Sequence, residues 1–256
     1  MSFGRRNPAD SAGEQLREIS FSEVGVGVVD DAADGDVYRP ILNDVNLRLT
    51  ESSVAVIGAN GSGKSTLLQL FNGLVTADTG QVLIDGLDPA EQARQVRSRV
   101  GFVFTDPAAQ LVMPTPLEDI ELSLRRSVPK AGRRDAAMTV LEELGIADLC
   151  DRSVYELSGG QRQLVALAAV LAVDPAILVL DEPTTLLDLR NKERLRKRLE
   201  DLIARRGVRV IFSTHDLDFA ASADRALVVD SGRVVHDSAP ASATQMYREL
   251  IMSDSS

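Results

Sequence analysis

The sequence has no tryptophan, a single cysteine and no long apolar run. One thiol, Cys150, excludes an internal disulfide and suits a reducing compartment such as the cytosol. The longest unbroken apolar run covers the ten residues 164–173, whereas a membrane-spanning helix needs about 20. The first 15 residues also lack the apolar segment of a secretory signal. We therefore expect a chain that is not secreted and does not cross a bilayer by itself.

Positive charge is also scarce. The chain has 28 Lys and Arg against 38 Asp and Glu, which gives a formal net charge of −10. Proteins that bind nucleic-acid backbones carry basic surfaces, so we expect no nucleic-acid partner. The 256 residues, 44% of them hydrophobic, are enough for one large domain with a sizeable core.

Apolar patterns along the chain alternate between those of strands and those of helices. Strands are expected within residues 16–29 and at 41–49, 54–57, 82–84, 100–104, 177–180, 208–212 and 226–229. Helices are expected at 65–74, at two places between 107 and 150, and at 158–173 and 189–204. This alternation predicts an α/β fold with a mostly parallel sheet covered on both faces. The polar residues 1–15 predict a disordered tail.

A glycine-rich loop follows the strand expected at 54–57. Its sequence, GANGSGKST at 58–66, fits the P-loop pattern G-x-x-x-x-G-K-[ST]. Such a loop points backbone N–H groups at phosphate oxygens, and the next helix adds its positive end. Lys64 would contact the β- and γ-phosphates of ATP and Ser65 would bind Mg²⁺. The predicted nucleotide-binding residues are Gly58, Asn60, Gly61, Ser62, Gly63, Lys64, Ser65 and Thr66. The alternative is a glycine-rich turn with an exposed lysine.

Two acids end the strand expected at 177–180. Ligands in open α/β folds bind at the carboxyl edge of the sheet, where Asp181 and Glu182 would lie. Asp181 would serve the metal, and Glu182 would orient and deprotonate the attacking water. Without the P-loop, such a pair could equally be an exposed loop.

The segment LSGGQ at 157–161 opens the apolar helix expected at 158–173. Ser158 is a good N-cap, and a helix N-terminus with free N–H groups is also an anion site. With this motif, the sequence resembles the ATP-binding cassette (ABC) family of transport ATPases, whose LSGGQ signature it matches without change. The resemblance implies that Ser158, Gly159, Gly160 and Gln161 meet the γ-phosphate held by the P-loop of a second subunit.

The resemblance also implies a fold and a division of the chain. The expected fold is α/β: a P-loop NTPase core with a mostly parallel sheet, an antiparallel β subdomain near the N-terminus and an inserted α-helical subdomain. The ABC ATPase domain would cover residues 16–240, with the helical subdomain at about 107–172. Residues 241–256 would form a C-terminal helix or tail.

Further motifs of the family occur in order. The segment TTLLD at 184–188 looks like the D-loop, which implies that Asp188 lies at a dimer contact. His215 follows the strand expected at 208–212 and matches the switch histidine that contacts the γ-phosphate. The resemblance thus implies three catalytic residues, Lys64, Glu182 and His215.

The chain departs from the family pattern at two places. The family has a glutamine after the strand at 100–104, where this chain has Thr105, whose hydroxyl can still bond a metal-bound water. Gln110 could stand in for that glutamine at the metal, or could cap the helical subdomain. The family also stacks adenine on an aromatic side chain ahead of the P-loop. Tyr38 is the candidate here, with plain packing as the alternative.

The segment DPAAQLVMPT at 106–115 resembles energy-coupling factor (ECF) and cobalt-type ATPases. These importers combine the ATPases with a transmembrane coupling protein and a small substrate-binding membrane protein. Leu111, Val112, Met113 and Leu117 would line an apolar groove for a helix of the membrane partner. Ordinary packing inside the helical subdomain is the alternative.

The resemblance implies an ATPase that uses ATP and Mg²⁺ and works as a homodimer or as an ATPase heterodimer. It would lie at the cytoplasmic face of the membrane as a peripheral subunit and power vitamin import. Several segments look most like the biotin-type ATPase. The alternatives are the ATPase of a cobalt or nickel ECF importer and a non-transport ABC ATPase that acts as an interaction protein.

Overall fold

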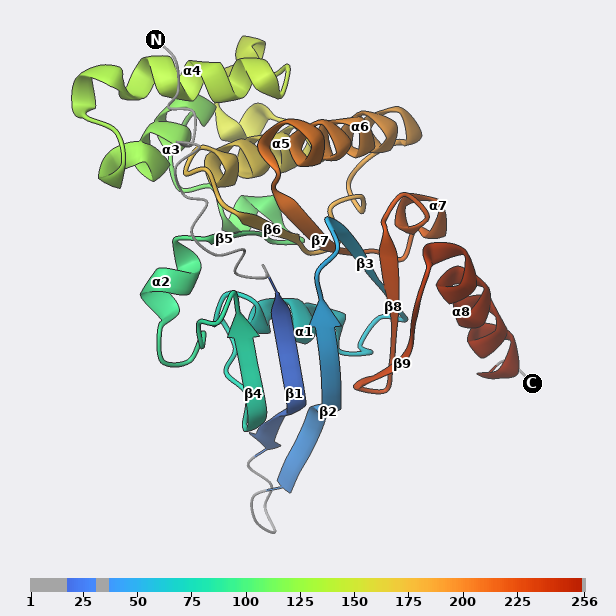
Figure 1. Ribbon diagram of the computed structural model, residues 1–256. Helices are drawn as coiled ribbons and strands as arrows, with labels where there is room; N and C mark the ends of the chain where they lie inside the picture. Colours follow the sequence, from blue (N-terminus) through green and yellow to red (C-terminus); the bar gives the residue numbers. More distant parts are fainter. Residues whose placement is uncertain (1–17, 31–36, 255–256) are drawn as a thin grey trace.

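The computed structural model of the protein describes residues 18–30 and 37–254. The predicted disordered tail at residues 1–15 lies outside these ranges. Within them the chain forms two sheets and a layer of helices, with the antiparallel sheet at one end of the molecule and the layer of helices at the other (Figure 1).

The strands confirm the predicted α/β class. A three-stranded antiparallel sheet has the order β2-β1-β4, with β1 (Ile19–Asp30), β2 (Val37–Leu49) and β4 (Thr79–Ile84). A six-stranded sheet has the order β5-β6-β7-β3-β8-β9. Its strands are β3 (Ser53–Ile57), β5 (Val100–Val103), β6 (Ile177–Leu180), β7 (Arg209–Ser213), β8 (Arg225–Asp230) and β9 (Arg233–Ser238). Only β9 runs antiparallel to its neighbour.

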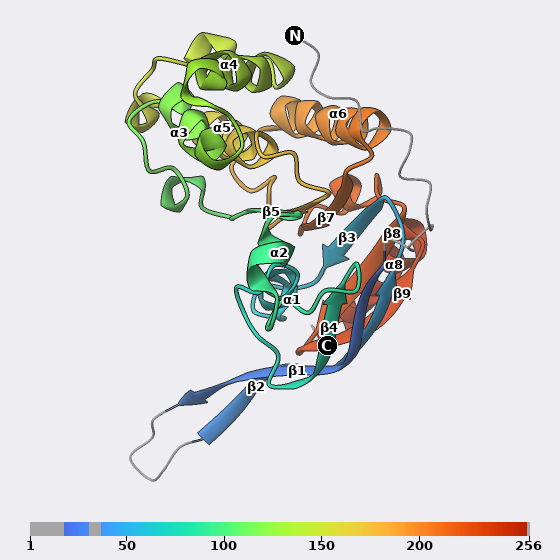
Figure 2. The same cartoon turned by 60° about the vertical axis from the view of Figure 1, so that its left-hand side comes forward.

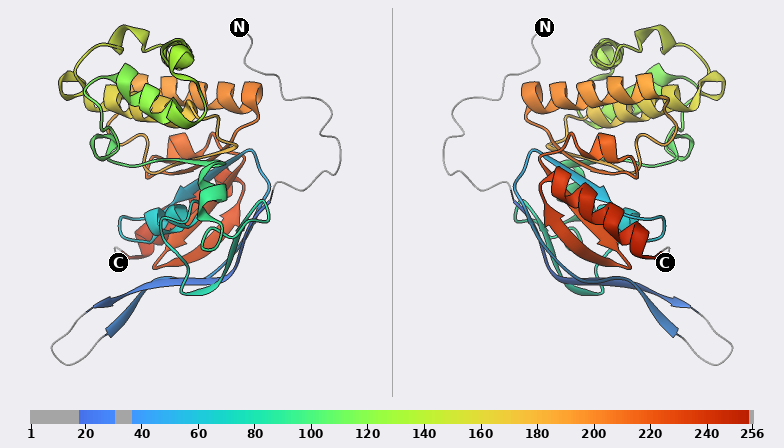
Figure 3. Two further views of the ribbon diagram at one scale, coloured as in Figure 1. Left: turned by 90° about the vertical axis from the view of Figure 1, so that its left-hand side faces the viewer. Right: turned by 90° about the vertical axis from the view of Figure 1, so that its right-hand side faces the viewer.

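The helices pack on both sides of the larger sheet. They are α1 (Lys64–Leu70), α2 (Ala93–Arg97), α3 (Pro116–Ser123), α4 (Arg133–Glu143), α5 (Gly159–Leu171), α6 (Leu189–Arg206), α7 (Leu217–Ala220) and α8 (Pro240–Asp254). The helices α3, α4 and α5 lie beside α6, away from the antiparallel sheet (Figure 3). Among residues 18–30 and 37–254, no helix combines the length and the apolar character that a bilayer crossing requires.

Two hydrophobic cores lie on the two faces of the six-stranded sheet, because successive side chains of a strand point to opposite faces. In β3, Val54 and Val56 join the core that contains α1 and the antiparallel sheet. Ala55 and Ile57 join the core that contains α3 to α8. Every residue of β3 is buried, as expected for a central strand covered on both faces.

Local signals begin and end the main helices. Ser158 caps α5 with a capping box, since its hydroxyl accepts from Gln161 N while the Gln161 side chain accepts from Ser158 N. Thr115 caps α3, and Pro116 occupies the first helical position. The longest helix, α6, begins after Asp188, which accepts from Asn191 N, and ends at Gly207 in the left-handed conformation.

The structure differs from the predicted elements at two strands, and it adds the short helices α2 and α7, which the sequence did not predict. The strand β9 was not predicted, because its alternation is between half-buried and exposed residues and so carries a weak apolar signal. The region expected to hold one or two strands is one strand, β1, with irregular pairing around Glu23, whose φ is 53°. Beyond β4, the paired strands β1 and β2 continue as a hairpin that projects from the molecule (Figure 2).

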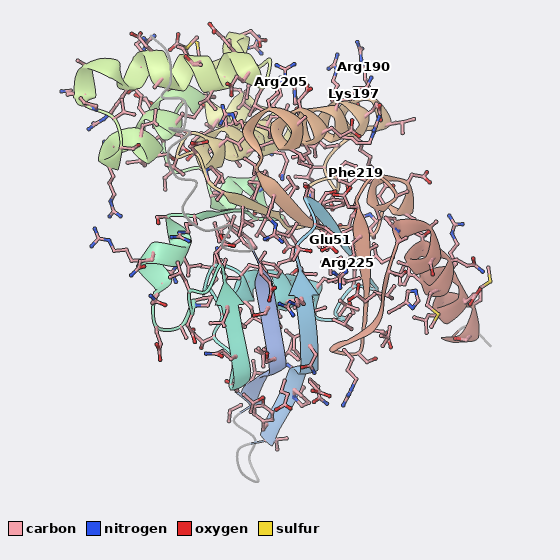
Figure 4. All side chains as sticks on the ribbon, viewed as in Figure 1. Glu51, Arg190, Lys197, Arg205, Phe219 and Arg225 are labelled. Atoms are coloured by element: carbon pink, nitrogen blue, oxygen red, sulfur yellow. The ribbon has the colours of Figure 1, made fainter. Side chains whose placement is uncertain are left out.

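Two arginines join the antiparallel sheet to the six-stranded sheet. Arg209, only 6% exposed, donates from Nη2 to Leu49 O at 2.9 Å and from Nε to Glu51 O at 3.1 Å. Arg225 donates to a carboxylate oxygen of Glu51 at 2.9 Å and forms an ion pair with Asp237. Glu51 and Arg225 lie close together between β2 and β8 (Figure 4). Both contacts satisfy polar groups where β2 passes into β3.

We expect Arg209→Leu to lower the free energy of unfolding by about 2–3 kcal/mol, because it removes the donors that bond the buried carbonyl of Leu49 and the part-buried carbonyl of Glu51. Urea unfolding followed by circular dichroism measures this change. The control is Arg205→Ala, on the outer side of α6 (Figure 4), where the side chain is 79% exposed. Equal unfolding midpoints for the two variants would contradict the proposed role of Arg209.

Candidate active site

The P-loop connects the end of β3 to the start of α1, as the sequence predicted. Gly61 and Gly63 have φ values of 79° and 106°, which favour glycine. A Cβ atom at Gly63 would also lie 2.9 Å from Leu42 Cδ2 and 3.1 Å from Ile41 O. Gly63 is therefore required both by its backbone conformation and by the close approach of β2.

The Lys64 side chain lies inside this loop and is 6% exposed. Its Nζ donates to the carbonyl oxygens of Gly58 and Ala59, each at 2.9 Å. Ser62 is buried and its hydroxyl has no hydrogen-bond partner in the described part of the chain. Asn60, Gly61 and Ser65 are exposed and Thr66 is half-buried. The loop thus combines a buried ammonium group with exposed positions at its rim.

Asp181 and Glu182 lie at the carboxyl edge of the same sheet, directly after β6. Ser213 Oγ, at the end of β7, donates to Asp181 Oδ1 at 2.6 Å. Ser213 Oγ in turn accepts from Glu182 N at 2.8 Å. Glu182 has a φ of 50°, a strained value for a non-glycine residue, and the Ser213 contact helps to hold it there.

The three predicted catalytic side chains lie together. Glu182 Oε1 is 3.7 Å from Lys64 Nζ, and Glu182 Oε2 is 2.8 Å from His215 Nδ1. Glu182 Oε1 is buried and makes no hydrogen bond among the described residues. The carboxylate therefore lies between a cation and an imidazole and has one oxygen free to accept a proton.

The four residues predicted to bind the metal differ in where they lie and in what they contact. Ser65 lies in the first turn of α1, and Asp181 and the half-buried Thr105 follow two adjacent parallel strands, β6 and β5. Gln110 has both amide atoms engaged with the outer edge of β5: Nε2 donates to Phe102 O at 3.2 Å and Oε1 accepts from Phe104 N at 3.3 Å. Both polar atoms of the Gln110 side chain are therefore engaged with the main chain at Phe102 and Phe104.

The predicted signature residues are at the N-terminus of α5. Ser158 and Gln161 form the capping box, so both side chains are engaged within the chain. Cβ atoms at Gly159 and Gly160 would lie 3.3 Å and 2.8 Å from the side chains of Leu186 and Leu187. The glycines thus allow the D-loop to pack on the first turn of α5. Asp188, exposed at the end of that loop, is the N-cap of α6.

Tyr38 lies on the projecting hairpin. Its ring covers Gly27 on the neighbouring strand, and its hydroxyl donates to Asp78 Oδ2 at 3.0 Å. These contacts correspond to the packing role that the sequence left open. Among the described residues, the hydroxyl of Tyr38 bonds Asp78 and makes no hydrogen bond to the P-loop.

The residues predicted to line a partner groove differ in exposure. Val112 is 73% exposed, and Leu111 and Met113 are half-buried. Leu117 is only 2% exposed and belongs to the core of the helical layer. The prediction that Leu117 lines a surface groove is therefore wrong, because α3 turns this side chain inward.

Three residues near these sites were not predicted from the sequence. Ser213 precedes the predicted His215 by two positions, but its buried location depends on the pairing of β6 with β7. Asp119 is a buried acid within α3, at 3% exposure. Burial, together with the negative charges of Glu182 and Asp230, raises the pKa of Tyr247 in α8. The C-terminal helix therefore comes within electrostatic reach of Glu182.

The arrangement has the parts of a P-loop ATPase: a glycine loop with a lysine, and a carboxylate at the carboxyl edge of a parallel sheet. The family model described as "ABC transporter" matches residues 42–185. The chain belongs to the ABC transporter family of ATP-binding proteins.

Curated relatives cover most of the chain. The biotin transport ATP-binding protein BioM of Rhizobium etli is 41% identical over 83% of this chain and 93% of its own length. The energy-coupling factor transporter ATP-binding protein EcfA1 of Streptococcus thermophilus is 36% identical over 82% of this chain and 77% of its own length.

Two solved structures share the fold over nearly their whole length. CbiO1 of Clostridium perfringens, described as part of the ABC transporter complex CbiONQ, has a TM-score of 0.77 and 29% identity, covering 92% of this chain and 93% of that chain. The dimeric ATP-binding cassette MJ0796 bound to ADP and phosphate has a TM-score of 0.77 and 30% identity, covering 87% and 98%.

We expect Ser213→Ala to lower kcat about tenfold with a smaller change in KM, because it removes the hydroxyl that holds Asp181 and the backbone of Glu182. Steady-state ATP hydrolysis by the purified chain measures both constants. Ser213→Thr keeps the hydroxyl and should retain most of the activity. A Ser213→Ala variant with an unchanged kcat would show that this hydrogen-bond chain does not position Glu182.

Proposed function

We propose that this chain is the ATP-hydrolysing subunit of an ECF-type ABC importer that takes up a vitamin, with biotin favoured. The observation that carries the hydrolytic part of the proposal is the position of Glu182 between Lys64 and His215, next to the P-loop. The importer class is supported by the similarity to EcfA1 and BioM and by the shared fold with CbiO1.

The residues at the sheet edge divide the chemistry among them. Lys64 and the backbone N–H groups of residues 58–66 would bind the phosphates of ATP. Glu182 Oε1 would accept the proton of the attacking water, since it is buried and has no hydrogen-bond donor of its own. His215 would keep the Glu182 carboxylate oriented through the 2.8 Å contact and would reach the γ-phosphate.

A magnesium ion fits the oxygen donors at this edge. Ser65 and Asp181 offer a hydroxyl and a carboxylate, and Thr105 offers a second hydroxyl. In the described ranges no group of three or more His, Cys, Asp or Glu side chains could hold a metal. Mg²⁺ is usually bound by one or two protein oxygens together with phosphates and water. When bound, the ion would neutralise charge on the phosphate oxygens.

Completion of each site would need a second ATPase subunit. The N-terminus of α5, from Ser158 to Gln161, would contribute its N–H groups to ATP held on the partner's P-loop. Relatives of this fold with a dimeric ATP-binding cassette support this arrangement. The partner would be a second copy of this chain or a related ATPase. A coupling protein and a small substrate-binding protein in the membrane would keep the pair at its cytoplasmic face.

We expect Glu182→Gln to abolish ATP hydrolysis while ATP-dependent dimerisation is retained, because the amide cannot accept the proton but keeps the shape of the side chain. Phosphate release measures hydrolysis, and analytical ultracentrifugation with and without ATP measures association. Glu142→Gln, at an exposed position of α4, is the control and should behave as the unchanged chain. Hydrolysis that persists in Glu182→Gln would remove Glu182 as the general base.

The importer class is tested by isolating the full-length tagged chain from solubilised membranes of its source organism. We expect a polytopic coupling protein and a small vitamin-binding membrane protein to co-purify, and mass spectrometry identifies both. Val112→Asp, which places a charge on the predicted docking surface, should lose both partners. Recovery of ribosomes or DNA without any integral membrane protein would instead favour a non-transport ABC ATPase.

A further inference from the structure

The segment from Phe104 to Thr115 crosses from the six-stranded sheet to the helical layer, and its first half is anchored on β5. β5 is an edge strand, so among the described residues the Phe102 C=O and the N–H of Phe104, just beyond β5, have no strand partner. The Gln110 amide supplies the missing contacts at 3.2 Å and 3.3 Å. The Gln110 side chain thus fixes the first half of the segment to β5, the strand that Thr105 follows.

The second half is anchored by Asp119 on α3. Its carboxylate oxygen Oδ1 accepts from both Val112 N and Met113 N, each at 2.9 Å. The side chain is 3% exposed, so these bonds are shielded from water in the folded chain. Asp119 lies in the first turns of α3, where the positive end of the helix favours a negative charge. The carboxylate therefore fixes the two residues that present Val112 to solvent.

The same segment is bonded to the chain that leads into α5. Pro114 O accepts from Val154 N at 2.9 Å, and Cys150 O accepts from Leu117 N at 3.1 Å. Val154 precedes Ser158, the first signature residue, by only four positions. Two exposed apolar side chains are close in sequence to this bond. Val112, two residues before Pro114, is 73% exposed, and Tyr155, directly after Val154, is 88% exposed. Apolar surface in this region is thus tied by main-chain bonds to the signature.

We propose that Asp119 is a positioning residue that couples the docking loop, residues 111–113, to α5, the helix that begins with the signature residues. It holds residues 112 and 113 so that a membrane partner seated on Val112 also displaces Pro114, Val154 and the N-terminus of α5. Asp119 does not contact the P-loop residues, so its effect on hydrolysis depends on the partner. This inference rests on the importer function proposed above.

Hydrogen exchange of the purified full-length chain tests the contacts themselves. In Asp119→Ala we expect the amides of residues 112 and 113 to exchange about tenfold faster. The amide of Val154 should also exchange faster, by a smaller factor, and the amides of residues 54–66 should be unchanged. Asp119→Asn keeps an acceptor oxygen and should retain the protection. Unchanged exchange at residues 112 and 113 in Asp119→Ala would overturn the proposal, as would equal acceleration throughout the chain.

ATP hydrolysis with and without membranes tests the function. The probe is inverted membrane vesicles from the source organism with its own copy of the gene deleted. For Asp119→Ala we expect basal hydrolysis within about twofold of the unchanged chain and a loss of vesicle-dependent stimulation of about fivefold or more. Asp119→Asn should restore the stimulation, and Glu121→Ala, on the same helix, is the matched control.

The outcomes separate the two proposals. No stimulation of the unchanged chain, or full stimulation of Val112→Asp, would contradict the importer function or its docking surface, whatever Asp119 does. Loss of stimulation in Val112→Asp with full stimulation in Asp119→Ala would overturn the role of Asp119 alone. A parallel fall in basal and stimulated hydrolysis for both Asp119 variants would reduce Asp119 to a residue needed for folding, which also overturns the proposal.

Discussion

The site depends on the parallel alignment of β3, β6 and β7. Val56 pairs with Ser213 and Leu180 with Phe212, so the three strands end at one level. The P-loop, the Asp181–Glu182 pair and the Ser213–His215 segment therefore emerge side by side, although they are far apart in the sequence. A shift of one residue in either register would turn these side chains to the opposite faces of the sheet. The alignment is thus the constraint on which the catalytic geometry rests.

Burial on both faces holds these strands in place. One core places α1 between the two sheets, and the other fills the space between the larger sheet and the helices α3 to α8. Arg209 and Arg225 add polar contacts at the edge where the two sheets meet. The rigid sheet then carries Glu182 in a strained backbone conformation, which the Ser213 hydroxyl helps to maintain.

Much of the site was predictable because its chemistry is local. The glycines around Lys64 and the acids after residues 177–180 occur in short runs that keep their meaning without tertiary context. The inward turn of Leu117 and the edge contact of Gln110 were not predictable, because both depend on how α3 and β5 lie relative to their neighbours. The strand β9 was not predictable either, because its side chains alternate only between half-buried and exposed, and this weak apolar pattern resembles that of a loop.

The order of the motifs and the alternation of strands and helices determined the fold class, the P-loop and the identity of the residues at the sheet edge. These features follow from side-chain periodicity and from backbone freedom at glycine, which are properties of short segments. The tertiary structure alone decided which distant groups meet. Three contacts depend on strand register and helix packing, which only the folded chain establishes: Ser213 with Glu182, Asp119 with Val112, and Pro114 with Val154.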